Sequence, residues 1–119
     1  MVQIIEKEIN VAYSPGHHQH CLVCQVPNSL LRREGLFKIA DPDQQWQRIR
    51  SILELVAEGK GNLKKLHFLF LPESIMPAAA VEQALDLIRN NFRPNTVTVF
   101  GVEHIRLLEY RQILQRYQQ

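Results

Sequence analysis

The chain has 119 residues, of which 45% are hydrophobic and 22% charged, and its formal net charge is +2. This size and apolar content predict one domain, spanning residues 1–119, that is large enough to bury a core. A charge so near zero argues against a nucleic-acid partner, which usually requires clustered Lys and Arg. The sequence contains neither a membrane-length apolar stretch nor a signal peptide, so we expect a cytoplasmic protein that does not enter a membrane.

Short apolar runs alternate with helical patterns along the chain, which is typical of βαβ units. The runs are residues 21–26 (CLVCQV), 66–71 (LHFLFL) and 96–101 (TVTVFG). Their near-continuous apolarity indicates strands that are covered on both faces. We therefore predict an α/β fold with a mostly parallel sheet of three or four strands and flanking helices. Ile9, Val11 and Tyr13 alternate with other residues, as in an edge strand.

The first helix has the clearest boundaries in the sequence. Asp41 is a suitable N-cap, Pro42 suits the first helical position, and glycines at 59–62 (GKGN) indicate the end. Between these ends, apolar residues recur at helical spacing and predict one apolar face, formed by Trp46, Ile49, Leu53 and Val56.

Two more helices follow, one over residues 78–91 and one within residues 103–119. In the C-terminal helix the arginines are spread around the helix axis and form no single stripe, so we expect them to lie on a solvated flank. We expect Tyr110, Leu114 and Tyr117 to dock on the sheet or on a partner chain. Residues 28–40 show apolar residues without a clear period, and we interpret them as an insertion that covers one end of the sheet.

Three strand ends give the chain a resemblance to the N-terminal portion of the carbon-nitrogen hydrolase (nitrilase) superfamily, over residues 20–103. "CLVCQVP" resembles the first strand of that family, which ends in Gln, here Gln25. "FLFLPES" resembles its second strand and Pro-Glu motif, and "TVTVFGVEH" resembles its third strand, which runs into Gly, here Gly101. The resemblance implies a sheet like half of a nitrilase α-β-β-α sandwich.

By this resemblance Glu73 occupies the position of the family's general base, which works with a Lys and a nucleophilic Cys on an amide or nitrile substrate. A carboxylate at the end of a buried strand is expected to be partly desolvated, which suits proton transfer. Glu103 and His104 follow the third strand and are further pocket candidates, although we favour an ordinary loop pair. For Glu73, the alternative to the inherited catalytic position is an acid that caps the following turn.

The sequence departs from the family after Glu73. The family's Lys and Cys lie downstream of the Glu, whereas this chain has no Lys after Lys65 and no Cys after Cys24. The resemblance therefore implies an idle carboxylate in a truncated or degenerate relative. We expect a homo-oligomer or a partner segment that covers the apolar sheet face left open. The alternatives are the N-terminal part of an active amidase or nitrilase, completed by a longer chain or another subunit, and a small α/β ligand-binding domain.

Histidines and cysteines cluster at residues 17–24, where His17, His18 and His20 precede Cys21 and Cys24. On a strand, the two cysteines point to opposite faces and cannot chelate one ion together. We therefore predict no physiological metal, and no motif in the chain indicates a cofactor.

Overall fold

A computed structural model describes residues 19–117, and the edge strand expected near residues 9–13 lies outside them. Its sheet contains three parallel strands in the order β1 (Cys21–Val23), β4 (Phe68–Phe70) and β5 (Val97–Val99). The predicted α/β class and the parallel sheet are confirmed. No helix among residues 19–117 is both long and apolar enough to cross a membrane.

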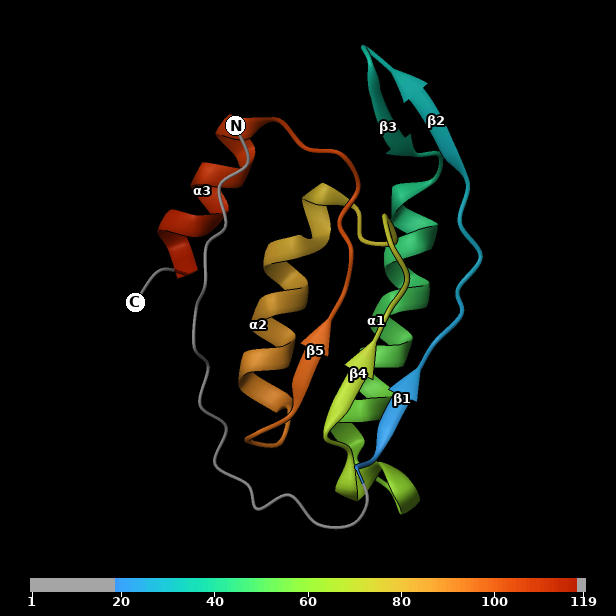
Figure 1. Ribbon diagram of the computed structural model, residues 1–119, viewed down its shortest axis with the longest axis vertical. Helices are drawn as coiled ribbons and strands as arrows, with labels where there is room; N and C mark the ends of the chain where they lie inside the picture. The colour runs from blue at the N-terminus through green and yellow to red at the C-terminus, as the bar shows by residue number, and fades with distance from the viewer. Residues whose placement is uncertain (1–18, 118–119) are drawn as a thin grey trace.

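Two helices, α1 (Pro42–Glu58) and α2 (Val81–Asn91), lie side by side behind the sheet (Figure 1). The connections from β1 to β4 and from β4 to β5 both lead to the next strand in the same direction across the sheet. Because crossovers between parallel strands have the same handedness, both helices lie on the same face. A 3-10 turn, η2 (Ala78–Ala80), leads directly into α2, so the helix predicted from residue 78 is confirmed with a tighter first turn.

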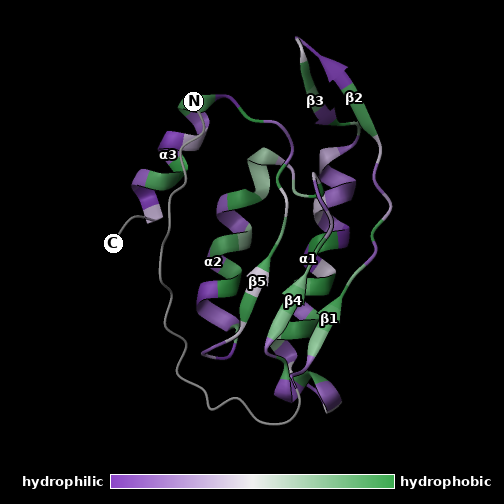
Figure 2. Ribbon diagram, viewed as in Figure 1, coloured by the Kyte–Doolittle hydropathy of each residue, from purple (hydrophilic) through white to green (hydrophobic). Residues whose placement is uncertain are grey.

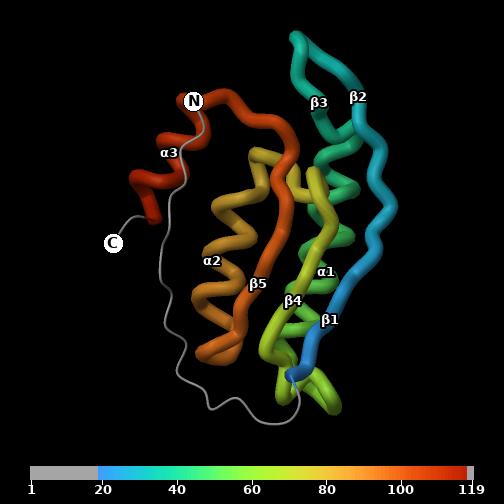
Figure 3. Tube along the Cα trace, viewed as in Figure 1, coloured from blue at the N-terminus to red at the C-terminus, as the bar shows by residue number. Residues whose placement is uncertain are grey.

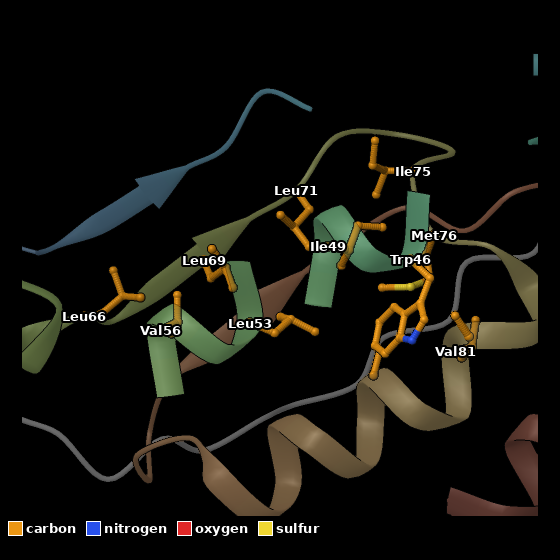
Figure 4. Packing of buried hydrophobic residues seen from close by; sticks show 12 residues of the cluster. Trp46, Ile49, Leu53, Val56, Leu66, Leu69, Leu71, Ile75, Met76 and Val81 are labelled. Atoms are coloured by element: carbon orange, nitrogen blue, oxygen red, sulfur yellow. The ribbon is translucent and has the colours of Figure 1, made fainter. Parts of the chain in front are cut away.

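Helix α1 begins and ends where its capping residues predict. The Asp41 carboxylate accepts a hydrogen bond from the Gln44 backbone N–H at 3.1 Å, and Gly59 ends the helix with a φ of 61°. The predicted apolar face is confirmed as the buried one. It packs against Leu69 of the central strand and against the start of α2 (Figure 4), through Trp46, Ile49, Leu53 and Val56.

The strands are shorter than the apolar runs that predicted them. The backbone hydrogen bonds between strands continue for one residue past β1 and β4. The Cys24 N–H donates to the Phe70 oxygen, and the Leu71 N–H donates to the Val99 oxygen. Pro72 then ends β4 because proline has no N–H to donate. Between α1 and β4 the chain forms a second 3-10 turn, η1 (Gly61–Lys65).

Residues 28–40 form an antiparallel hairpin of β2 (Leu30–Arg33) and β3 (Leu36–Ile39). Its turn residues Glu34 and Gly35 both have positive φ, 51° and 79°, as a two-residue hairpin turn requires. The hairpin projects beyond the carboxyl end of the sheet (Figure 1) and contacts the segment after β5 through Phe37 and His104. Its position matches the predicted insertion.

Helix α3 (Leu107–Tyr117) docks on α2, not on the sheet. The Tyr117 hydroxyl donates to an Asp86 carboxylate oxygen at 3.0 Å, and Arg116 pairs with Glu82 and Asp86. Arg116 is exposed, as expected of a solvated flank, and two acids on α2 also pair with it there.

Candidate functional site

The segments that follow β4 and β5 run together beyond the carboxyl edge of the sheet (Figure 3). The Gly101 N–H donates to the Pro72 oxygen at 3.3 Å, and the Met76 N–H donates to the Gly101 oxygen at 3.0 Å. A Cβ at Gly101 would lie 2.7 Å from both the Glu73 Cα and the Ser74 N, which is closer than real Cβ contacts. Glycine is therefore required here by the close approach of two backbones.

Glu73 lies three residues past the central strand, beside Gly101, while Gln25 follows the neighbouring strand β1. Both side chains are exposed. Within residues 19–117 no group pairs with the Glu73 carboxylate. The expected partial desolvation of this carboxylate is wrong for the described residues, because no side chain covers it.

Replacing Glu73 with glutamine should change the free energy of unfolding by less than about 0.5 kcal/mol, because an exposed carboxylate without a partner stabilises nothing. Urea unfolding of the E73Q variant, compared with the parent chain, measures this change. A clearly larger loss would mean that the carboxylate caps a turn.

Glu103 is the carboxylate that the fold buries, with only 7% of the residue exposed. One oxygen accepts from the Ile39 N–H at 3.4 Å and lies 3.5 Å from the Lys38 ammonium nitrogen, and the other accepts from the Ala78 N–H at 3.0 Å. These partners come from the hairpin and from η2. Glu103 thus joins the hairpin to the amino end of the α2 segment.

His104, next in sequence, binds the same strand of the hairpin, β3, two residues before Ile39. Its Nδ1 accepts from the Phe37 N–H at 3.2 Å, its own N–H donates to the Phe37 oxygen at 3.3 Å, and the two rings meet edge to face. A pocket of about 550 Å³ lies between the hairpin, η2 and the start of α3. Of the predicted pocket residues, only Glu103 lines it, whereas Gln25, Gly101 and His104 do not.

No helix or hairpin of the described residues covers the sheet face opposite α1 and α2, and the strands of the sheet are mostly hydrophobic (Figure 2). Leu22, Leu69 and Thr98 are in register and face the helices. Their neighbours along each strand therefore point the other way. These form the open face, which consists of Cys21, Val23, Phe68, Phe70, Val97 and Val99. The prediction that both sheet faces are covered is not met within residues 19–117.

Two features make the open face more than a set of scattered apolar residues. Val23 is 70% exposed and Val99 48% exposed, on the two outer strands. Between them, the stacked rings of Phe68 and Phe70 have centroids 5.9 Å apart on the central strand. Sequence patterning could not show which face is open, because strands with this apolarity usually have both faces covered.

The two cysteines lie on opposite sides of the first strand. Cys21 is exposed on the open face, whereas Cys24 packs against the core, where burial raises the pKa of its thiol. Among residues 19–117, no cluster of three or more His, Cys, Asp or Glu is placed to hold a metal ion. His17 and His18 of the predicted cluster lie outside these residues.

Comparisons of the chain with protein-family models, with curated proteins and with solved structures found no match.

Proposed function

We propose that the chain is a nitrilase-like α/β module that acts by binding a second copy of itself through the open face, without hydrolysing amides or nitriles alone. The open face is the single observation that carries the proposal. The absence of Lys after Lys65 and of Cys after Cys24 supports the second part, because the family triad needs both residues after the Glu.

A second copy matches this face in polarity and charge. Sheets that pack face to face bury one apolar face from each, and a two-fold axis brings the same surface patch together from both subunits. None of the six residues of the open face is charged, so self-pairing desolvates no charge and brings no like charges together. Burial of the open face is expected to provide the main driving force.

Sedimentation velocity over a range of concentrations should show a dimer in the parent chain and a monomer in the Val99→Lys variant. The added ammonium would have to be buried without a partner. Leu55→Lys is the matched control, because Leu55 is 54% exposed but lies on α1, behind the sheet. A parent chain that stays monomeric, or equal dissociation by both variants, would contradict the proposal.

Alkylation of the two cysteines gives an independent test. In dilute solution, iodoacetamide should modify Cys21 faster than Cys24, because Cys21 is exposed and burial raises the pKa of the Cys24 thiol, which lowers its thiolate fraction. At concentrations that favour the dimer, Cys21 should become protected. Peptide mass spectrometry measures both rates, and a Cys21 rate that is independent of concentration would count against pairing through the open face.

A second candidate function is the N-terminal part of a carbon-nitrogen hydrolase whose Lys and Cys are supplied by a longer chain or another subunit. The position of Glu73 after the central strand, against Gly101, favours it. Immunoblotting of cells that express the protein naturally tests the longer-chain form of the second candidate, which predicts a product of full nitrilase size. A product of 119 residues excludes that form, and an amidase assay of the complex that copurifies with the protein then tests whether another subunit supplies the Lys and Cys: hydrolysis supports the second candidate, and its absence supports the first.

A further inference from the structure

The pocket of about 550 Å³ is bounded by the hairpin, η2 and the start of α3, which all lie at the carboxyl end of the sheet (Figure 1). In open α/β sheets this end is the usual place for a ligand, and the volume is within the range of small-molecule sites. The pocket shares no residue with the open face. Half of its lining residues are apolar, namely Leu36, Ile39, Pro42, Pro77, Ala78 and Ala79.

The other lining residues are three cations and three carboxylates, so their formal charges sum to zero. Four of these charges form two ion pairs. The Lys38 nitrogen lies 3.5 Å from an oxygen of the buried Glu103, and the Arg106 Nη2 lies 2.7 Å from an oxygen of Glu34. One cation and one carboxylate are therefore left over.

The two remaining charges are Arg33, on the hairpin, and Glu109, in the first turn of α3. Residues 19–117 provide no ion-pair partner for either, and Glu109 accepts one hydrogen bond, from the Arg106 N–H at 3.3 Å. The Arg106–Glu34 ion pair joins the same two elements. The hairpin and α3 thus approach closely enough for one small molecule to reach both remaining charges.

Arg33 has a second cation beside it on the hairpin. Arg33 is opposite Leu36, and Lys38 is two positions further along β3, so all three side chains belong to one face of the hairpin. The Lys38 ammonium group has three donors and makes a single contact, with Glu103, so it can also donate to a ligand carboxylate. Glu103 is a positioning residue here, because it holds the ammonium group at the pocket.

We propose that this pocket binds a small apolar α-amino acid. The carboxylate of the ligand lies between Arg33 and Lys38, its ammonium group meets Glu109, and its side chain packs on the apolar wall. Charge-assisted hydrogen bonds are the strong ones, and a zwitterion supplies a counter-charge at both ends of the pocket. A carboxylic acid or an amine alone leaves either Glu109 or Arg33 without a counter-charge.

A ¹H–¹⁵N NMR titration of the full chain with L-leucine, at one protein concentration and constant ionic strength, tests the assignment. The matched probes are 4-methylpentanoate, which is leucine without its amino group, and 3-methylbutylamine, which is leucine without its carboxyl group. We expect saturable shifts of the Ile39 and Ala78 amide signals, and a dissociation constant at least about tenfold lower for leucine than for either probe. Shifts that do not saturate with leucine, or a probe that binds as tightly as leucine, would overturn the assignment.

Variants assign the two ends of the ligand. Arg33→Gln and Glu109→Gln should each weaken leucine binding at least about tenfold. In Glu109→Gln, leucine should also lose its advantage over 4-methylpentanoate, which a purely structural role of Glu109 does not predict. Glutamine keeps an oxygen that accepts from the Arg106 N–H, so α3 should keep its first turn.

Arg32→Gln is the matched control. Arg32 precedes Arg33 on β2, so its side chain belongs to the opposite face of the hairpin, and it does not line the pocket. Leucine should bind this variant as tightly as it binds the parent chain. Equal losses in the Arg32→Gln and Arg33→Gln variants, or unchanged leucine binding in Glu109→Gln, would overturn the proposal.

Discussion

Replacing Glu103 with alanine should lower the free energy of unfolding by about 2–3 kcal/mol, because it removes a buried carboxylate that three donors share. The Ile39 and Ala78 N–H groups would lose their acceptor, and Lys38 would lose its counter-charge. Urea unfolding followed by circular dichroism measures the loss. A change below about 1 kcal/mol would mean that water replaces the carboxylate without cost.

The matched variant Glu103→Gln keeps the volume and one acceptor oxygen, so it should lose less stability than Glu103→Ala. The loss should also be local. Hydrogen exchange of the Ile39 and Ala78 amides is expected to accelerate first, since Glu103 joins the hairpin to η2. Uniform acceleration across α1 and the sheet would contradict this role.

Replacing Gly101 with alanine should cost about 2–3 kcal/mol, because the new Cβ would overlap the backbone of Glu73 and Ser74. The two backbone segments cannot easily move apart, because backbone hydrogen bonds join Gly101 to Pro72 and to Met76. Thermal and urea unfolding of the variant measure the loss.

Gly35→Ala is the control for this substitution. A Cβ at Gly35 would meet nothing within 4 Å, but its φ of 79° disfavours alanine, so we expect a loss of about 1 kcal/mol from backbone strain alone. Equal losses at the two glycines would contradict a steric role for Gly101.

Local signals explain which parts of the fold could be predicted from the sequence. The Asp41 and Pro42 start, the Gly59 end and the spacing of Trp46, Ile49 and Leu53 all act within one helix, and the structure confirms them. The positions of the three strands were also predictable, because each apolar run contains one strand.

Features that depend on distant partners were not predictable in this way. The hairpin turn uses Glu34 before Gly35, and glutamate is not a strong signal for positive φ, so residues 28–40 show no clear pattern. The burial of Glu103 depends on Ile39 and Ala78, which are 64 and 25 positions away.

In the candidate site, too, the positions of residues along the chain were predictable, whereas their surroundings were not. Glu73 and Gly101 lie after neighbouring strands, as parallel strands require, but their solvation depends on which elements cover the sheet. An apolar run such as residues 66–71 indicates two covered faces whether the cover comes from this chain or from a partner. The sequence could therefore predict an apolar sheet, but not which of its faces is open.

The most direct measurement is an isotope-filtered NOE experiment on a mixture of ¹³C-labelled and unlabelled copies, at a concentration where sedimentation shows the dimer. Association through the open face predicts intermolecular contacts between the rings of Phe68 and Phe70 and the methyl groups of Val23 and Val99. Intermolecular contacts that come only from other surfaces, such as α3, or a monomer at every accessible concentration, would contradict it.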